Sequence, residues 1–420
     1  MAREHIITGI DIGSRYIYTV ITAFNPDAPV PKVIGVGKVA SEGIRKGLVT
    51  NISEAASAVL RSVEEAERYA GVSASRAFVS VGGSHIVSQQ SRGTIAVSRA
   101  DGEISENDVA RVIEEASAVA FPANREILHN IPSEFIVDGQ GGLRDRDVVG
   151  MNGIRLEANT LMIGGSTPHL RNLERVLSEN NIDYQGFVLS PLAASKSVLS
   201  RQQKEVGVLC LDMGAGTTNL AVHENGQLIY ANVLPIGGDN ITNDLAIGLR
   251  VQIETAEILK REFGMATSGE ISKGETIDLS QLNPNEEGKV SRKDVVTIME
   301  ARLNEIFDMV NKELRGIGRE AYLPGGVVLV GGCTKIPRIV DLCRQKLRLP
   351  TQIGFPRDVE GVVASMDDPS YATVIGLVFW GIEESGYKTG GGGKGISMPS
   401  SGIAKSMLSK LGKLTRSLLP

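Results

Sequence analysis

The sequence predicts an α/β protein built from two similar halves, with an α+β segment inserted into the first half. Two stretches share a plan of strand, Asp-x-Gly turn and strand: ITGIDIGSRYIYTVITAF at 7–24 and VLCLDMGAGTTNLAV at 208–222. Such an internal duplication, with about 200 residues between the copies, implies two halves that face each other. Between 84 and 165 the pattern changes to a helix followed by alternating strands, which indicates the insertion.

The composition agrees with this class and excludes others. The 420 residues are long for one core, and 42% apolar, 4% aromatic and 48 glycine residues suit an α/β protein with many tight turns. Because the net charge is −5, we do not expect binding to nucleic acid through bulk charge. Cys210, Cys333 and Cys343 form neither a disulfide framework nor a metal-spaced pair. No apolar signal segment follows Met1, so a cytoplasmic protein is expected.

In the first half, strands are expected at HIITGIDIG, YIYTVITAF, KVIGVGKV and AFVSVGG, with a helix over 51–70 before the last of them. The insertion contains the helix ISENDVARVIEEASAVAF, in which Ser105 is the N-cap and Asp108 lies three places on. The strand GIRLEANTLMIGG closes the insertion. The helix TPHLRNLERVLSENN and the strand YQGFVLS then return to the first half.

In the second half, a helical region is expected over 240–262, a polar exposed excursion over 264–290 and a long helix over 291–315. The buried strand VVLVGG then leads to a helix with Pro337 near its start. The run YATVIGLVFWGI at 371–382 is expected to be a buried helix. It is too short for a membrane span, which needs about 20 residues.

Each Asp-x-Gly turn places an aspartate at a strand end, followed by glycine and hydroxyl residues. Glycine lets backbone N–H groups approach a phosphate closely, and Ser14, Thr217 and Thr218 add hydroxyl donors. Asp11 and Asp212 would repel bare phosphate, but they suit Mg²⁺, whose bound waters bridge carboxylate to phosphate. One such turn alone is more simply a β-hairpin. Two of them, with VLVGG further along the chain, favour a nucleotide site.

These motifs, in this order, resemble the superfamily of actin, sugar kinases and heat-shock chaperones. The resemblance implies an actin-like fold that binds ATP and Mg²⁺, with phosphates at the two turns and adenosine at the Gly-Gly after VLV. AEILKRE resembles the chaperone helix that packs on adenine and ribose, although a solvated helix face is the simpler interpretation of that stretch alone. IGGDN matches a Gly-Gly turn near the nucleotide. The nucleotide-binding residues thus implied are Asp11, Gly13, Ser14, Arg15, Asp212, Gly214, Ala215, Gly216, Thr217, Thr218, Gly237, Gly238, Glu257, Lys260, Arg261, Gly331 and Gly332, with Asp11 and Asp212 also holding Mg²⁺ through water.

Within the superfamily, the chain resembles the FtsA family of bacterial cell-division proteins over essentially its whole length. The resemblance rests on IDIGS, NIPSEFIVDG, PLAAS, DMGAGTTNLAV and VVLVGG, together with the inserted segment and the C-terminal segment. It implies subdomain 1A at 1–83 with returning segments at 166–192 and 355–385, inserted subdomain 1C at 84–165, subdomain 2A at 193–242 and 320–354, and subdomain 2B at 243–319. A flexible Gly-rich linker at 386–401 and an amphipathic helix at 402–420 complete the expected organisation.

One position departs from the chaperones and bacterial actins. Their connecting segment reads E-P-x-A-A, and its carboxylate orients the attacking water, whereas this chain reads SPLAAS with Ser190 at that place. A neutral hydroxyl is a poor general base, and general-base catalysis contributes roughly 10²- to 10⁴-fold. We therefore expect ATP binding with weak or no ATPase activity, and we assign no catalytic residue.

The chain ends on a basic, leucine-rich segment, 400–420, without an acidic residue. On a helical wheel its apolar and basic residues fall on opposite arcs, which is typical of a helix that lies in the headgroup plane of an anionic membrane. Docking on the protein's own body or in a partner's groove is the alternative, and the glycine linker argues against docking on the body, because a flexible spacer suits a helix that reaches away. The residues expected at the membrane are Ile403, Met407, Leu408, Leu411, Leu414, Leu418, Lys405, Lys410, Lys413 and Arg416.

The expected function is an ATP-binding, polymerising scaffold on the cytoplasmic face of the cell membrane at the division site. The FtsA resemblance implies that it tethers the tubulin-like protein FtsZ, whose C-terminal peptide would dock within 243–319, with Lys293 and Arg302 as contacts. It also implies that other division proteins bind through subdomain 1C. Two alternatives stay open: a sugar-kinase-type phosphotransferase, against which Ser190 argues, and an actin-like pilus-assembly scaffold, against which the tail helix argues.

Overall fold

The computed structural model of the chain describes residues 4–118, 121–122, 124–269, 271–272, 274–361 and 367–386. The predicted tail helix and all of the predicted linker except Gly386 lie outside these residues. Among the helices that are described, none has the length and apolar character needed to cross a membrane.

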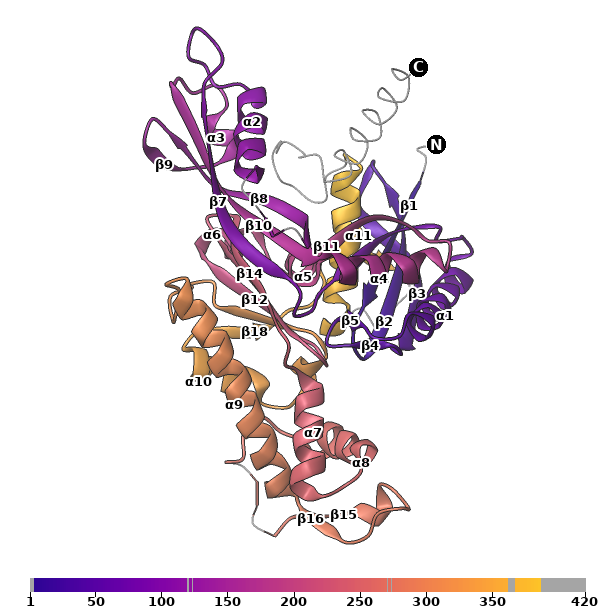
Figure 1. Ribbon diagram of the computed structural model, residues 1–420. Helices are drawn as coiled ribbons and strands as arrows, with labels where there is room; N and C mark the ends of the chain where they lie inside the picture. Colours follow the sequence, from indigo (N-terminus) through magenta and orange to yellow (C-terminus); the bar gives the residue numbers. More distant parts are fainter. Residues whose placement is uncertain are drawn as a thin grey trace.

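Two sheets with the same plan form the body of the molecule (Figure 1). The strand order β3-β2-β1-β6-β11 in the first sheet corresponds to β14-β13-β12-β17-β18 in the second. In both sheets the strand that carries the aspartate pairs antiparallel with the next strand and parallel with a later one, which confirms the predicted duplication. The strands are β1 (His5–Ile12), β2 (Tyr16–Asn25), β3 (Ala28–Ala40), β6 (Arg76–Val81), β11 (Asp183–Leu189) and β19 (Glu360–Gly361) in the first sheet, and β12 (Val208–Met213), β13 (Thr218–Glu224), β14 (Gln227–Leu234), β17 (Val327–Val330) and β18 (Thr351–Ile353) in the second.

Helices pack on these sheets, and their ends follow local sequence signals. α1 (Ile52–Ala70) begins at Asn51, whose side chain accepts a hydrogen bond from the Glu54 N–H, and ends at Gly71 in the left-handed conformation. α11 (Ala372–Glu384) is buried over most of its length, as predicted from its apolar run. The other elements of the two halves are β4 (Ile44–Arg45), β5 (Leu48–Val49), α4 (Thr167–Ser178), α5 (Ser190–Val198), α6 (Arg201–Val206), α7 (Gly238–Leu249), α8 (Ile253–Ile258), a π-helical turn (Leu259–Phe263), β15 (Thr276–Asp278), β16 (Lys289–Ser291), α9 (Arg292–Gly316) and α10 (Ile339–Leu347).

The insertion forms its own antiparallel sheet of order β7-β10-β8-β9 with α2 packed against it. Its elements are β7 (Val87–Ala96), α2 (Glu106–Ser117), β8 (Arg125–Val137), β9 (Gln140–Leu143), α3 (Asp145–Val148) and β10 (Arg155–Ser166). The predicted capping box is present, because Ser105 accepts from the Asp108 N–H and Asp108 accepts from the Ser105 N–H. A separate apolar core that includes Val112, Phe135 and Leu156 holds the subdomain together.

Two predictions need correction in the second half. The helical region expected over 240–262 is broken at Arg250, which adopts a left-handed φ of 58°, so that α7 and α8 meet at an angle. The excursion at 264–290 is not simply an exposed loop. Its strand β15 pairs with β16, and Ile277 and Leu279 are buried in the core of this half. The sequence pattern missed these anchors because they are isolated apolar residues in a polar stretch.

Candidate functional site

A cavity of about 420 Å³ lies between the two halves, where the two Asp-x-Gly turns face each other. Its size is in the range of pockets that bind small molecules. Most of the predicted nucleotide residues line it: Asp11, Gly13, Ser14, Arg15, Asp212, Gly214, Ala215, Gly216, Thr217, Gly238, Glu257, Lys260, Arg261, Gly331 and Gly332. The fold therefore brings residues from both halves, far apart in the sequence, to one place.

The turns of the two halves touch each other, and glycine makes this contact possible. Ser14 Oγ accepts a hydrogen bond from the Gly47 N–H at 3.0 Å, which ties the first turn to the β4–β5 hairpin. A Cβ on Gly216 would lie 2.6 Å from Ser14 Oγ and 2.9 Å from the Cα of Lys46. Any larger residue at 216 would push the halves apart, so glycine keeps the walls of the cavity close.

Glycine is also required at Gly331, where the backbone passes close to Asp212. Its φ is +86°, and a Cβ there would lie 2.4 Å from Asp212 Oδ1. By contrast, a Cβ on Gly332 would meet no atom of the described residues within 4 Å, so among these residues nothing covers the backbone at 332. The Gly-Gly after β17 thus supplies both a tight turn and an uncovered surface on the cavity wall.

Two predicted residues do not line the cavity. The Thr218 side chain is buried, and its hydroxyl donates to the Ile236 carbonyl at 2.8 Å, so it is not available as a donor for phosphate. Gly237 lies behind the second turn, where a Cβ would come within 2.6 Å of the Gly214 and Ala215 carbonyl oxygens. These residues hold the turn in place instead of contacting a ligand. The sequence pattern could not separate residues that line the cavity from residues that support the turn, because Thr217 and Gly238, which line it, are adjacent to Thr218 and Gly237.

The two aspartates fit a divalent cation. Asp11 accepts a hydrogen bond from Ser80 Oγ at 2.6 Å, and Asp212 accepts from Asn219 Nδ2 at 2.9 Å. Burial raises the pKa of Asp11 to about 7; the Ser80 hydrogen bond opposes this rise, and repulsion from Asp212 adds to it. Burial also raises the pKa of Asp212, against the Asn219 hydrogen bond. A cation between them would relieve this shared desolvation and repulsion.

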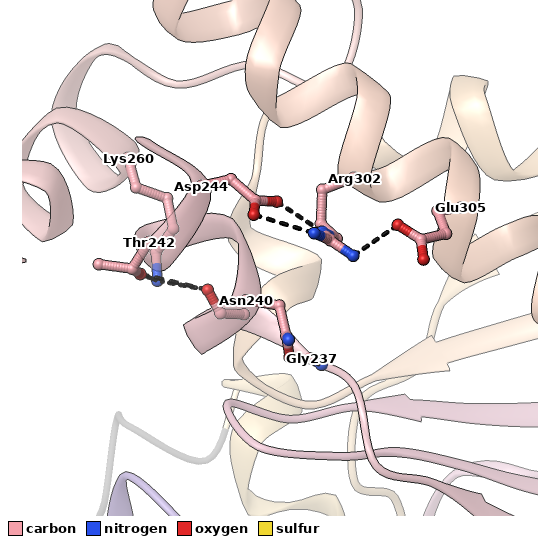
Figure 2. Close-up of polar contacts among 8 residues, drawn as sticks. Gly237, Asn240, Thr242, Asp244, Lys260, Arg302 and Glu305 are labelled. Carbon is pink, nitrogen blue, oxygen red and sulfur yellow. Dashed lines mark hydrogen bonds and ion pairs between the residues drawn. The ribbon is translucent and has the colours of Figure 1, made fainter. Parts of the chain in front are cut away.

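The AEILKRE motif contributes Glu257 and Lys260 to a polar network on the second half, and Figure 2 shows Lys260 beside Thr242. Lys260 Nζ lies 2.6 Å from Glu257 Oε2 and donates to Thr242 Oγ1 at 2.7 Å. Arg15 from the first half reaches Glu257 Oε1 at 3.5 Å, so this ion pair crosses the cavity. Burial acts to raise the pKa of Glu257, but Lys260 and the hydrogen bonds outweigh it, and the pKa is lowered. Glu257 is therefore an ionised anchor for the cations around it.

The cavity also contains residues that the motifs did not indicate. Tyr18 stands opposite Asp11 across the β1–β2 hairpin, and Asn219 stands opposite Asp212 across the β12–β13 hairpin. Cross-strand register is the signal that could have found both, since residues opposite each other share a face. Lys38 lines the same wall, with its Nζ 4.8 Å from the centre of the Tyr16 ring. It lies on β3, and only the pairing of β3 with β2 brings it to the cavity, so no short motif could have indicated it.

Ser190 lies in the cavity wall, at the first turn of α5. Its side chain is buried, and Oγ donates to the Val81 carbonyl at 3.1 Å. No group at this position can serve as a strong base, because a serine hydroxyl is not basic at neutral pH.

The two cations predicted for partner binding differ in their surroundings. Arg302 is held by Asp244, with Nη2 to Oδ1 at 2.9 Å, and also pairs with Glu305 (Figure 2). A partner carboxylate would have to displace one of these ion pairs. Lys293 lies at the start of α9. The sequence pattern showed the basic residues of one helix, but not that Asp244 of another helix neutralises Arg302.

Comparisons with known proteins agree with this architecture. A family model described as the cell division protein FtsA matches residues 209–376, and one described as the SHS2 domain inserted in FtsA matches residues 83–164. FtsA of Pseudomonas aeruginosa is 33% identical over 96% of this chain and 93% of its own length, and FtsA of Bacillus subtilis is 35% identical over 90% of this chain and 84% of its own.

Solved structures show the same fold at low sequence identity. The PilM–PilN type IV pilus biogenesis complex matches with a TM-score of 0.65 at 15% identity, covering 90% of this chain and 98% of that one. MreB5 of Spiroplasma citri bound to ADP matches with a TM-score of 0.53 at 12% identity, covering 91% and 97%. The duplicated sheets around a glycine-lined cavity thus define an actin-like protein. With its inserted SHS2 domain and its full-length relatives, the chain belongs to the FtsA family of cell-division proteins.

Proposed function

We propose that this chain binds ATP with Mg²⁺ in the cavity between its halves and polymerises as a cell-division scaffold that links FtsZ to the cytoplasmic membrane. The observation that carries the nucleotide part is the meeting of both Asp-x-Gly turns, two desolvated carboxylates and several cations in one cavity of about 420 Å³. Two structures of MreB5, which has the same fold, are bound to ADP and to AMPPNP, and this supports nucleotide binding.

In this proposal each part of the cavity has a role. The Gly13 N–H donates to the Tyr16 carbonyl at 3.2 Å and shapes the first turn, whereas the backbone N–H of Gly216 would hold phosphate. Gly331 and Gly332 would lie along the adenosine. Lys260 and Arg261 would border the ribose and adenine, with Glu257 fixing Lys260. Asp11 and Asp212 would hold Mg²⁺ through its waters, and the ion would neutralise charge on the phosphates.

Titration with a fluorescent ATP analogue, with and without Mg²⁺, tests nucleotide binding. We expect Asp212→Asn to abolish the Mg²⁺-dependent part of the affinity, a loss of about 10-fold or more, because the amide cannot balance the ion's charge. Glu64→Gln, a change at an exposed carboxylate of α1, is the matched control and should bind normally. Equal affinities for the unaltered protein and Asp212→Asn would refute the metal assignment.

We propose weak or no ATPase activity, because Ser190 replaces a carboxylate. In a single-turnover assay, Ser190→Glu should hydrolyse bound ATP about 10²-fold faster than the unaltered chain, since general-base catalysis typically contributes that much. Rapid turnover by the unaltered protein would show that another group acts as base.

Membrane attachment is proposed for residues 402–420 and would place the scaffold at the cytoplasmic face of the membrane. One such helix binds marginally, and many copies along a filament would bind far more tightly through effective concentration. Sedimentation with anionic liposomes and ATP, with and without FtsZ, compares the full chain with one truncated after Gly393. Binding by the truncated form equal to that of the full chain would exclude the tail as the anchor.

The remaining partner assignments are part of the same proposal. The FtsZ C-terminal peptide would dock on 243–319, where Lys293 is the simpler contact because Arg302 already pairs with Asp244 and Glu305. Other division proteins would bind through subdomain 1C at 84–165. A pilus-assembly role is less well supported, because the likeness to PilM at 15% identity concerns the fold alone.

A further inference from the structure

Lys38 lines the cavity, but the function proposed so far gives it no role. It lies on β3, and its ammonium stands 4.8 Å from the centre of the Tyr16 ring and 5.4 Å from the centre of the Tyr18 ring. A cation within about 6 Å of an aromatic face is attracted to that face. The two rings therefore keep the ammonium at the cavity wall, although Lys38 is an exposed residue.

The register of the first sheet places Lys38 in one row with the first aspartate. Tyr18 stands opposite Asp11 in the β1–β2 pair and opposite Lys38 in the β2–β3 pair. Residues directly opposite each other on neighbouring strands share a face, and all three line the cavity. The backbones of Asp11 and Lys38 are thus two strand spacings apart, about 10 Å. A lysine side chain and a phosphate group can fill this gap together.

Lys38 differs from Arg15, the other cation that the first half contributes to the cavity lining. Arg15 pairs with Glu257 at 3.5 Å. Among the residues that the structure describes, no carboxylate pairs with Lys38, and its ammonium donates no hydrogen bond. The Glu65 carboxylate on α1 accepts from the backbone N–H of Lys38 instead. The Lys38 ammonium is therefore available to an anion in the cavity.

The first Asp-x-Gly turn has few donors left for phosphate. The Gly13 N–H donates to the Tyr16 carbonyl at 3.2 Å, and Arg15 is engaged in its ion pair. Ser14 Oγ accepts from the Gly47 N–H, which leaves its own proton as a donor. A phosphate chain that approaches the buried aspartates repels them, so it needs a further cation from this side of the cavity.

We propose that the Lys38 ammonium, positioned by the rings of Tyr16 and Tyr18, binds the phosphate chain of the nucleotide from the first half. The inference rests on the proposed binding of ATP and adds a phosphate ligand to it. The second half would hold the adenosine, and the phosphate chain would extend from there toward Asp11 and Lys38. A lysine carries three donors on a flexible stem, so a short movement from the rings is enough to meet a phosphate. Lys38 is thus a binding residue, and Tyr16 and Tyr18 are positioning residues.

Titration of the full chain with fluorescent ATP and ADP analogues in the presence of Mg²⁺ tests this assignment. Lys38→Met, which keeps a long unbranched side chain without the charge, should lower both affinities roughly 10-fold, the scale of one charge-assisted hydrogen bond at a partly exposed site. Lys38→Arg keeps the charge and should stay within about 3-fold of the unaltered chain. Lys32→Met, at an exposed lysine of the same strand, is the matched control and should bind normally.

The tyrosine rings are tested through their effect on Lys38. Tyr16→Leu should weaken binding roughly 2- to 5-fold, because it removes one cation–π contact, whereas Tyr16→Phe keeps the ring and should retain most of the affinity. In a chain that already carries Lys38→Met, Tyr16→Leu should have no further effect, since the ring acts only through the ammonium. Equal losses from Tyr16→Leu with and without Lys38 would show that the ring does not position this cation.

Acylation of lysines with acetic anhydride, followed by mass spectrometry, gives a readout that does not depend on affinity. Mg²⁺ and ATP should reduce the labelling of Lys38 several-fold and leave Lys32 unchanged, whereas adenosine, which has no phosphate, should protect neither. If ATP binds and Lys38→Met binds it as tightly as the unaltered chain, or Lys38 is labelled equally with and without ATP, the assignment is wrong while the proposed function stands. If the unaltered chain binds no ATP, the proposed function fails, and this inference fails with it.

Discussion

At the scale of single residues, the buried carboxyl of Asp11 lowers the stability of the fold above neutral pH and supplies a candidate ligand for a cation. The carboxyl is partly buried beside Asp212 and has one hydroxyl donor, Ser80. Burial and the neighbouring charge raise its pKa to about 7, so that ionising it in the folded protein is unfavourable. A group with a raised folded-state pKa stabilises the fold below its unfolded pKa, and that contribution is lost as the pH rises.

Asp11→Asn should therefore stabilise the protein above neutral pH while it weakens Mg²⁺-dependent nucleotide binding. The unfolded aspartate titrates near 4 and the folded one at about 7, so the unaltered chain loses stability between these values, whereas the variant does not. Thermal melting at pH 8 and pH 4 measures the difference, which should be positive at pH 8 and close to zero at pH 4. A variant that melts lower than the unaltered chain at pH 8 would contradict this account.

At the scale of elements, the position of Ser190 depends on how α5 packs against α11. The two helices approach so closely that a Cβ on Gly376 would lie 1.7 Å from the Ala193 carbonyl oxygen. Ser190 begins the same helix, one turn before Ala193, and Ser197 at its other end donates to the Ala372 carbonyl at 2.6 Å. Helix α11 thus holds α5, and with it Ser190, in place.

Gly376→Ala should destabilise the protein and alter the cavity, because α5 must move to admit the methyl group. Overpacking in a core typically costs about 1–3 kcal/mol, which a shift in the thermal midpoint reports. ATP affinity should fall in the same variant. Gly316→Ala at the end of α9 is the matched control and should be neutral or slightly stabilising, since in the described part of the chain no atom lies within 4 Å of a Cβ there. Equal melting of both variants would rule out the close contact.

The same scale explains which elements the sequence could predict. The cap at Ser105 and the paired Asp-x-Gly hairpins could be predicted, because each is a local pattern formed by a few adjacent residues. Arg302 was predicted as a partner contact from the basic residues of its own helix, and only tertiary packing brings Asp244 to it. Asn219 was not predicted for a related reason: its buried Oδ1 has no hydrogen-bond partner among the described residues, and this is a tertiary feature that no sequence motif contains.

At the scale of the whole molecule, the inserted subdomain touches both halves. It is connected to the first half at both of its ends, yet Ser88 Oγ on β7 donates to the Ala231 carbonyl on β14 at 2.7 Å. Arg144, just before α3, also pairs with Glu205 on α6. Since β14 is the edge strand of the second sheet, the insertion covers an edge that would otherwise be open to pairing (Figure 1).

Because the cavity lies between the halves, any rotation that closes it must shift or strain the contact between the insertion and β14. Glu205→Lys places like charge against Arg144 and should loosen this contact. Hydrogen exchange should then rise several-fold in β7 and β14, whose amides depend on local opening, and stay unchanged in α1. Glu64→Lys, on the exposed face of α1, is the control for an added positive charge.

Addition of ATP and Mg²⁺ should slow exchange in β7 of the unaltered chain and have less effect in Glu205→Lys. Equal protection of β7 in both proteins, with and without nucleotide, would show that the insertion moves independently of the cavity.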